Sequence, residues 1–457
     1  MIKLYNTLTR HKGFLPEQKK IRLFVCGPTV YDYLHIGNAR TYIFFDFFTK
    51  YLRGQGYDVF YLQNITDIDD KIIRRAAEEN VTPAKLAETF LKAYLADMKA
   101  LGVDAVTEYA SATDFITQIA AQVERLIDGG YAYLIDGDGW YFDISKFADY
   151  GKLSGRTALQ AEDSVTRIDD SVAKRNKGDF CLWKFSKPGE PSWSSQMGEG
   201  RPGWHIEDTA ISEYYFGPQY DIHGGGVDLK FPHHEAEIAQ QEAASGRKPF
   251  VREWIHVGAL LAEGKKMSKS LGNFITIRDF LVDHAPETLR WITLTHHYRS
   301  PIDYSPSLAA QAKAAINTLG AFAAKLDRTD GSETVDAHMV VENNSLKFHE
   351  ALADDVNTPA AIASLFELMA RFQQKIWHLK ASEAKIIKNY LTESLGLLGF
   401  SLKRPKIPAE VEKMAKEREK LRVNKQFVQA DALRAQISGV GYEIEDTPRG
   451  YFLWPIA

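Results

Sequence analysis

The pattern of apolar and polar positions begins with a short strand, a helix and a second strand. Residues 21–26 form an apolar run rich in strand-forming side chains, which Gly27 and Pro28 end. Residues 36–53 carry apolar side chains at helical spacing, and residues 58–63 read as another strand. A strand, a helix and a strand at this separation predict a βαβ unit with a parallel sheet.

A second group of predicted strands follows a long stretch in which turn residues are frequent. Residues 219–223 predict a strand followed by three glycines and a helix that begins near Pro232, and residues 254–258 predict a further strand. Between these two groups of predicted strands, residues 112–202 contain a helix, a hairpin signal at residues 136–139 and many turn residues. We interpret this stretch as an insertion within the sheet domain.

The last third of the chain changes to helical spacing. Three segments have apolar residues three and four apart and predict helices, namely 309–326, 356–379 and 384–398. A charged helix over residues 408–437 then leads into a small hairpin built from residues 442–444 and 451–454. The predicted fold class is therefore α/β, with a Rossmann-like parallel sheet, an insertion, an α-helical bundle and a small C-terminal α+β domain.

Composition narrows the class of protein. The 457 residues are 45% hydrophobic and 25% charged, as in ordinary globular proteins, and suggest about three domains. The chain has 56 basic and 60 acidic residues, so its net charge does not attract nucleic acid. Any nucleic acid that binds must contact a local basic patch. Two cysteines exclude a disulfide framework, and the start has no apolar signal core. We expect a reduced, cytoplasmic enzyme that does not span a membrane.

The first chemistry-bearing segment covers residues 26–38 and passes from a strand end into a helix start. A helix N-terminus there offers unpaired N–H groups to phosphate, and His35 can add a donor, which suits nucleotide chemistry. The alternative is a plain helix start with a satisfied histidine.

The second segment, residues 265–273, carries Lys266 and Lys269 between glycines. Two cations on a mobile loop can neutralise a departing pyrophosphate. The alternative is a solvated basic loop.

The third segment covers residues 221–237. Three consecutive glycines (Gly224, Gly225 and Gly226) would let a ligand such as adenosine approach the backbone, and Asp228 is placed to bond a hydroxyl or an amine. His233 and Glu237 are four apart on one helix face and so form a two-ligand metal clip. The alternative is an exposed helix pair.

Together the three segments resemble class I aminoacyl-tRNA synthetases. Two further stretches, residues 64–71 and residues 200–207, are similar to cysteinyl-tRNA synthetase in particular, and the resemblance spans nearly the whole chain. It implies six segments: a first half of the catalytic domain (1–111), a connective-peptide insertion (112–202), the second half (203–258), the signature-lysine loop and stem-contact region (259–308), a tRNA-binding helical bundle (309–400) and an anticodon-binding domain (401–457).

In that family a zinc ion is held by two cysteines, a histidine and a glutamate. The matching positions here are Cys26, His233 and Glu237, while the remaining cysteine position falls on Asp208. Aspartate is a competent zinc ligand, so we expect a Cys/Asp/His/Glu site. Three alternatives stay open: three protein ligands with a water, a thiolate from Cys181, or no metal.

The resemblance also implies the reaction and its residues. Cysteine would attack ATP, with Mg²⁺, to form cysteinyl-adenylate, and the acyl group would pass to the terminal adenosine of tRNA. His35, Asn38, Lys266 and Lys269 are the expected catalytic residues. ATP would be bound by His35, Gly37, Asn38, Gly224, Gly225, Gly226, Asp228 and Lys269, and cysteine by Gly27, Thr29, Thr66 and Trp204. The family's first signature usually ends in histidine, so Asn38 is a departure and we expect its role to be weaker.

The C-terminal part is the candidate tRNA contact. Residues 403–434 contain ten basic and five acidic side chains, a local excess of five. The aromatic side chains that follow can stack on unpaired bases or form a small core: Tyr442, Tyr451, Phe452 and Trp454. We expect a monomer. Two other functions compete, a cysteine ligase that acts on an amino sugar and a non-catalytic tRNA-binding paralogue.

Overall fold

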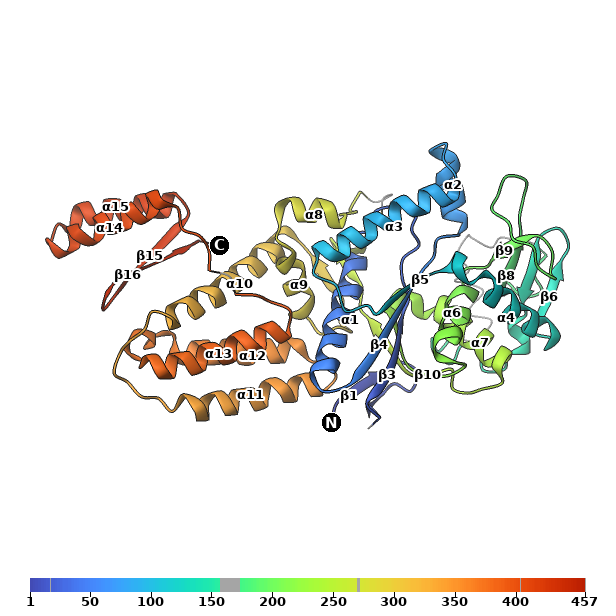
Figure 1. Ribbon diagram of the computed structural model, residues 1–457, viewed down its shortest axis with the longest axis horizontal. Coiled ribbons are helices and arrows are strands. Elements are labelled where there is room, and N and C mark those ends of the chain that lie inside the picture. The colour runs from blue at the N-terminus through green and yellow to red at the C-terminus, as the bar shows by residue number, and fades with distance from the viewer. Residues whose placement is uncertain (17, 157–172, 269–271, 403, 457) are drawn as a thin grey trace. The chain divides into compact units, whose positions relative to one another are not determined.

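The chain folds into two compact units, which the computed structural model describes over residues 1–16, 18–156, 173–268, 272–402 and 404–456 (Figure 1). The first unit is Met1–Asp283 with Tyr298–Asp303, and the second is His284–His297 with Tyr304–Ala457. These two units do not test the six segment boundaries given above, which stay predictions.

A parallel sheet forms the centre of the first unit. Its strands run in the order β11-β10-β3-β4-β5, and every neighbouring pair is parallel. The strands are β3 (Lys20–Val25), β4 (Asp58–Ile65), β5 (Glu108–Ser111), β10 (Tyr220–Gly226) and β11 (Val251–Val257). The predicted βαβ unit and the parallel sheet are thereby confirmed, and the strand predicted at residues 219–223 extends three residues further.

Helices cover both faces of this sheet. In the view of Figure 1, α1 and α3 lie on one side of the strands, and α4, α6 and α7 lie on the other. The bounds of the helices in this unit are α1 (Ile36–Gly54), α2 (Asp70–Glu78), α3 (Pro83–Ala100), α4 (Ile116–Asp128), α6 (Ile206–Phe216), α7 (His233–Ser245) and α8 (Ile277–Asp283). Helix α1 therefore matches the predicted 36–53 almost residue for residue.

The ends of α1 and α7 follow from local chemistry. His35 caps α1: its ring accepts from the Asn38 backbone N–H, and the Asn38 side chain accepts from the His35 N–H. Gly246 ends α7 in the left-handed conformation, with φ of 65°. Both helices start just beyond strand ends, which brings their N-termini to the carboxyl edge of the sheet.

The insertion forms its own antiparallel sheet, in the order β6-β7-β8-β9. Its strands are β6 (Ala132–Ile135), β7 (Gly139–Phe142), β8 (Phe180–Phe185) and β9 (Gly200–Pro202). The hairpin predicted at residues 136–139 is confirmed as the β6–β7 turn. Smaller pieces complete this unit: a ribbon of β1 (Lys3–Asn6) and β2 (His11–Phe14), and a sheet of β12 (Leu260–Ala262), β13 (Lys265–Lys266) and β14 (Ile302–Tyr304).

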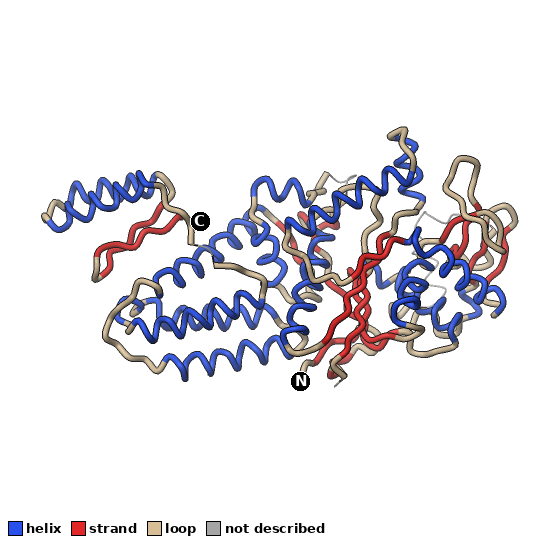
Figure 2. Tube along the Cα trace, in the orientation of Figure 1, coloured by secondary structure: helices blue, strands red, loops and turns tan. Residues whose placement is uncertain are grey.

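The second unit is helical with one terminal hairpin, as the helix and strand colours of Figure 2 show. Its helices are α9 (Pro286–Leu294), α10 (Pro306–Leu326), α11 (Ala337–Ala353), α12 (Thr358–Gln373), α13 (Ala381–Leu397), α14 (Ala409–Val423) and α15 (Phe427–Gly439). The hairpin pairs β15 (Tyr442–Thr447) with β16 (Gly450–Pro455) and is confirmed.

Two helix predictions in this unit are wrong. The single charged helix expected over 408–437 is two helices, because Lys425 between them takes a φ of 59° that no α-helix contains. The segment predicted over 356–379 ends as α12 at Gln373, and a short 3₁₀ turn (Ile376–His378) follows. None of the helices in the described part of the chain is long and apolar enough to cross a membrane.

Candidate functional site

Four side chains expected to hold a metal converge at the carboxyl edge of the parallel sheet. Cys26 follows the last residue of β3, and Asp208 lies in the first turn of α6. His233 opens α7, and Glu237 lies one turn later. All four are buried, and one ligand atom from each lies within 4.8 Å of those of the other three.

The spacing of these atoms fits a tetrahedral ion. His233 Nε2 lies 3.1 Å from Asp208 Oδ2 and 3.1 Å from Glu237 Oε1. Cys26 Sγ lies 3.8 Å from Glu237 Oε1. Zinc bonds of about 2.0–2.3 Å at tetrahedral angles place ligand atoms about 3.3–3.6 Å apart. The four donors are therefore close to the positions that a zinc ion requires.

The electrostatics of the cluster also favour a cation. Burial, followed by Glu237 and Asp208, raises the pKa of the Cys26 thiol well above its usual value. Burial and Asp208 raise the pKa of Glu237 in the same way. Glu237 Oε2 is buried without a hydrogen-bond partner. A divalent cation would remove these penalties, because it stabilises the thiolate and the carboxylates together.

Two histidines that the sequence did not single out border the same cluster. His223 on β10 and His234 on α7, together with Cys26 and Glu237, form a second group of possible ligands. Burial lowers the pKa of both imidazoles well below the usual value, so each is neutral and able to bind a metal. Cys181 belongs to neither group. It lies in an apolar cluster with Tyr133, Ile135 and Tyr141, as expected of a buried structural cysteine.

The predicted cysteine-binding residues lie beside the cluster. Gly27 donates its backbone N–H to Asn64 Oδ1 at 2.6 Å, and a Cβ at Gly27 would lie 1.7 Å from the Asn64 carbonyl oxygen, so only glycine fits there. Asn64 Nδ2 also donates to Asp208 Oδ1 at 2.7 Å. Thr29 and Thr66 pair through a parallel bridge. These bonds join the predicted amino-acid pocket to the predicted ligand Asp208.

Glu207 is a further buried group that the sequence reading missed. The Thr66 hydroxyl donates to Glu207 Oε2 at 2.9 Å, while Glu207 Oε1 is buried without a partner. Burial, followed by Asp208, raises the pKa of Glu207 well above the usual value. Its place next to Asp208 in sequence was the available signal.

Trp204 covers the cluster. Its ring stacks on that of His233, with centroids 4.4 Å apart and planes 19° apart, and it is half-buried. The Lys71 ammonium lies 5.9 Å from the Trp204 ring centroid. A half-buried ring against a predicted ligand fits a pocket wall better than a core residue.

The predicted ATP-binding residues of the first segment surround the start of α1. Burial, followed by Lys266, lowers the pKa of His35 to about 4, so the imidazole is neutral at pH 7. A Cβ at Gly37 would lie 2.8 Å from the His35 ring, so the missing side chain lets the ring lie over the helix start. Asn38 caps the backbone of His35 and does not replace a titrating histidine.

The glycines that end β10 have different neighbours. A Cβ at Gly224 would lie 2.1 Å from Phe45, and one at Gly225 would lie 2.9 Å from His234. These two glycines allow close packing of α1 and α7. A Cβ at Gly226 would meet the end of the Asp228 side chain at 2.6 Å and the Thr41 hydroxyl at 3.9 Å. The space expected for adenosine is therefore best matched at Gly226, and a nucleotide role for the other two stays a prediction.

The lysine segment is described only in part. Lys266 on β13 donates to Asp228 Oδ2 at 2.5 Å, and both side chains are exposed. This ion pair joins the predicted pyrophosphate-binding lysine to the predicted ATP-binding aspartate. Lys269 lies outside the described residues.

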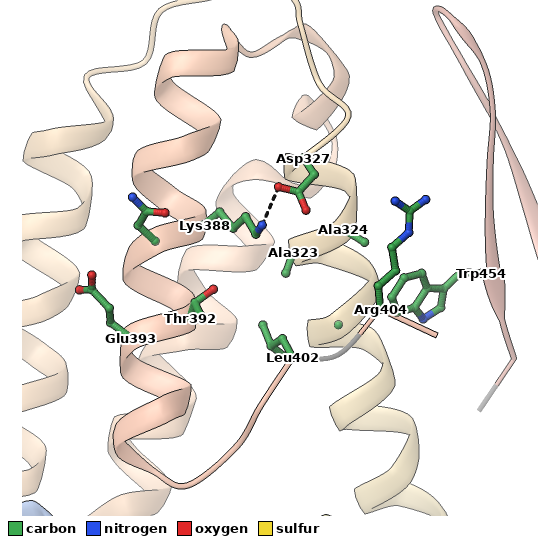
Figure 3. A pocket seen from close by; sticks show the side chains of 11 residues that line it. Ala323, Ala324, Asp327, Lys388, Thr392, Glu393, Leu402, Arg404 and Trp454 are labelled. Atoms are coloured by element: carbon green, nitrogen blue, oxygen red, sulfur yellow. Dashed lines mark hydrogen bonds and ion pairs between the residues drawn. The ribbon is translucent and has the colours of Figure 1, made fainter. Parts of the chain in front are cut away.

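The aromatic side chains of the C-terminal hairpin form a core. Phe452 and Trp454 are buried and pack with Ala324 of α10. Tyr442 and Tyr451 pack against a second apolar cluster that includes Ile444. Of the two alternatives for these aromatic side chains, stacking on bases or forming a small core, the structure shows the small core. Trp454 also borders a hollow of about 290 Å³ between α10 and α13 (Figure 3).

Comparisons with known proteins identify the family of the chain. A family model described as tRNA synthetases class I (C) catalytic domain matches residues 14–314, and a DALR domain model matches residues 347–403. The chain is similar to the cysteine–tRNA ligase of Thermococcus onnurineus, at 43% identity over 98% of both chains. It is similar to that of Thermoplasma acidophilum at 44% identity, over 97% of this chain and 98% of the relative.

Solved structures support the fold. Methionyl-tRNA synthetase of Mycobacterium tuberculosis, in complex with methionyl-adenylate, aligns with a TM-score of 0.61 at 15% identity, over 83% of this chain and 90% of that one. A leucyl-tRNA synthetase of Agrobacterium radiobacter in a ternary complex aligns with a TM-score of 0.58 at 12% identity, over 84% and 86%.

Proposed function

Because the chain belongs to the cysteine–tRNA ligase family of class I synthetases, we propose that it ligates L-cysteine to tRNA in two steps at the site described above. Cysteine and ATP would first form cysteinyl-adenylate and pyrophosphate, and the acyl group would then pass to the terminal adenosine of tRNA. The observation that carries the ligase assignment is the match over nearly the full length of these relatives. The amino-sugar ligase and the non-catalytic paralogue are set aside on the same ground.

The metal site of the proposal is Cys26, Asp208, His233 and Glu237. Its support is the burial of all four side chains and their mutual spacing. A bound zinc ion would hold the substrate sulfur as a thiolate and so favour cysteine over serine, whose hydroxyl stays protonated. Asn64 would keep Asp208 in place through the 2.7 Å bond to its other oxygen.

The residues around the metal site would position the amino acid. Gly27 lets the end of β3 pack closely on the backbone of Asn64, and Thr29 and Thr66 lie side by side across a backbone bridge. The Thr66 hydroxyl donates its proton to Glu207 and accepts a bond of 3.4 Å from Asn64 Nδ2, so one lone pair is left to accept from the substrate ammonium. Trp204, stacked on His233, would exclude water from the sulfur.

The nucleotide would bind at the start of α1. At the helix N-terminus the Gly37 N–H would donate to the phosphates, and neutral His35 would add its Nε2–H. Asn38 would hold that ring in place, because its backbone N–H donates to His35 Nδ1. Residues Gly224, Gly225, Gly226 and Asp228 would border the adenosine. Lys266 and Lys269, with Mg²⁺, would neutralise the departing pyrophosphate while the cysteine carboxylate attacks the α-phosphate in line.

The tRNA would contact the second unit, where the DALR model matches. Helix α14 has five basic and four acidic side chains, so most of the local basic excess of five lies in the residues on either side of it. We also propose that the protein acts as a monomer in the cytoplasm. The support for a reducing compartment is that neither of its two buried cysteines forms a disulfide. Size-exclusion chromatography with light scattering would test the monomer.

Two assays test the function directly. Cysteine-dependent ATP–pyrophosphate exchange is expected, with serine supporting a rate lower by orders of magnitude, and charging of bulk tRNA with cysteine should follow. Exchange without tRNA charging would indicate an amino-sugar acceptor, and the absence of both would indicate a non-catalytic paralogue. Elemental analysis of the purified protein should find about one zinc per chain.

A further inference from the structure

Two histidines beside the proposed metal site have no role in the reaction as derived so far. His223 Nε2 lies 3.3 Å from Cys26 Sγ and 3.5 Å from Glu237 Oε2. His234 Nε2 lies 3.0 Å from Cys26 Sγ and 4.0 Å from Glu237 Oε1. The four ligand atoms all lie within 4.8 Å of one another, as in the first set. Cys26 and Glu237 are common to both sets.

The donor atoms of this second set have the spacing of a tetrahedral zinc site. Its sulfur-to-nitrogen separations of 3.0 and 3.3 Å lie close to the edge of about 3.5 Å that zinc bonds to sulfur and nitrogen imply. The Glu237 oxygen nearest His223 is Oε2, which is buried and has no hydrogen-bond partner. A fully buried carboxylate oxygen that has no hydrogen-bond partner and lies 3.5 Å from an imidazole nitrogen needs a ligand of its own.

The second set also has outer hydrogen bonds that would hold its imidazoles. His223 Nδ1 bonds the Tyr220 hydroxyl at 2.6 Å. His234 Nδ1 bonds His256 Nε2 at 2.8 Å, and His256 Nδ1 bonds the Thr7 hydroxyl at 2.9 Å. Metal-binding histidines normally have such a partner on the ring nitrogen that does not face the ion. The nitrogen facing Cys26 is Nε2 in both residues.

Packing fixes the two rings. His223 stacks on Trp254, with centroids 4.3 Å apart and planes 24° apart. His234 fits against Gly225, where a Cβ would come within 2.9 Å of its ring. Neither ring needs to rotate for Nε2 to face the sulfur, so the second set is preorganised without an ion.

The chemistry of the donors distinguishes the sets. The first offers one thiolate, two carboxylates and one imidazole, and the second offers one thiolate, one carboxylate and two imidazoles. Zinc is borderline-soft and well suited by imidazole and thiolate, so the second is the softer set. It also places one negative charge fewer around the ion.

We propose that Cys26, His223, His234 and Glu237 form a second binding position for the same metal ion, which keeps the ion in the pocket when Asp208 does not ligate it. The inference rests on the metal site of the proposed function. Its consequence is that this chain tolerates an aspartate at position 208, because two imidazoles are available to replace Asp208 and His233.

Metal content of the full-length protein after dialysis against a chelator tests the proposal. Asp208→Asn keeps the bond to Asn64 and removes the carboxylate. We expect this variant to retain about one zinc per chain, with an apparent Kd raised at most about a hundredfold. Asp208→Asn combined with His223→Gln should lose the ion, whereas His223→Gln alone should keep it. Cys26→Ser should lose it alone, and Cys181→Ser, which changes a buried thiol outside both sets, should not.

X-ray absorption gives a second readout that does not depend on activity. The number of imidazole ligands should rise from one in the unaltered protein to two in Asp208→Asn. Loss of zinc from Asp208→Asn as complete as from Cys26→Ser would overturn the proposal, as would retention with a single imidazole.

The same experiments distinguish a failure of the proposed function from a failure of the second metal position. An unaltered protein without zinc and without cysteine-dependent exchange would contradict the proposed function itself. A protein with zinc and exchange, in which Asp208→Asn alone empties the site, would contradict only the second position.

Discussion

At the scale of single residues, Lys266 is the described cation best placed for the leaving group. Its side chain is exposed and donates to Asp228 at 2.5 Å. Burial and the Lys266 charge lower the pKa of His35, the residue that caps α1. Replacing Lys266 with alanine should lower the rate of cysteine-dependent ATP–pyrophosphate exchange by about 10²–10³-fold, because preorganised charge acts most strongly in the transition state. Steady-state exchange kinetics would measure it.

Lys265→Ala is the matched control for this prediction. Lys265 is adjacent and also exposed, and its loss should change the rate by less than about twofold. Equal losses in both variants would show that only general loop charge matters.

His35 makes a second residue-scale prediction, on stability. Its pKa is lowered to about 4 in the folded state by burial and Lys266, against about 6.5 when unfolded. Above pH 6.5 both states are neutral. As the pH falls from 6.5 towards 4 the unfolded state takes up the proton first, so folding stability is lost. His35→Asn keeps a good helix cap and removes the titration.

We therefore expect the wild type to lose about 1 kcal/mol more than His35→Asn between pH 7 and pH 5, after allowing for the partial exposure of His35. Chemical denaturation at several pH values would measure the difference. His338→Asn, at an exposed histidine, should follow the wild type. Parallel pH profiles for wild type and His35→Asn would contradict the prediction.

The residues of the metal site show which parts of it could be predicted from the sequence. The resemblance placed Cys26, Asp208, His233 and Glu237 in one site, and the structure brings these four together. His223 could not be found this way, because its approach to Cys26 depends on the register in which β10 pairs with β3, His223 opposite Phe24. Register between strands about 200 residues apart leaves no local signal.

At the scale of elements, sequence periodicity predicted strands and amphipathic helices well and missed elements that break the pattern. Helix α11 went unpredicted because its buried face, Val340, Asn344, Phe348 and Leu352, is interrupted by a polar residue. Asn344 is satisfied by the Ser364 carbonyl and the Tyr390 hydroxyl, contacts that only the folded bundle provides. The break at Lys425 has no glycine or proline to mark it.

The β15–β16 hairpin carries the element-scale prediction. Trp454 is 7% exposed, its indole N–H donates to Asn317 Oδ1 at 2.8 Å, and it packs beside Phe452. Trp454→Ala should destabilise the second unit by about 3–5 kcal/mol through the cavity it leaves. Charging of tRNA should fall more than about tenfold, while cysteine-dependent exchange should stay within about twofold, because exchange uses residues of the first unit.

Chemical denaturation and the two activity assays would measure these effects. Met339→Ala, at a half-exposed apolar residue of α11, is the control and should change neither activity. A parallel loss of exchange and charging in Trp454→Ala would show that the hairpin supports the whole chain and not tRNA binding in particular.

At the scale of the whole molecule, a chain of net charge −4 must bind a polyanion through a local surface. Helix α14 presents three exposed lysines at positions three and four apart, Lys413, Lys416 and Lys420, which therefore share one face. If these contact phosphates, the KM for tRNA should rise steeply with salt while the KM for cysteine changes little. Replacing all three with glutamine should reduce the slope of log KM against log salt by about 2, since each phosphate contact contributes about 0.7–0.9.

The matched control removes the same charge from the first unit. Lys85, Lys92 and Lys99 are exposed on α3, and their triple replacement with glutamine should leave the slope unchanged. Aminoacylation kinetics between about 50 and 200 mM salt would separate the two variants, because the ion atmosphere of tRNA is displaced only where phosphates are contacted. Equal slopes in both would mean that tRNA responds to the total charge of the molecule, and α14 would lose its place as the contact surface.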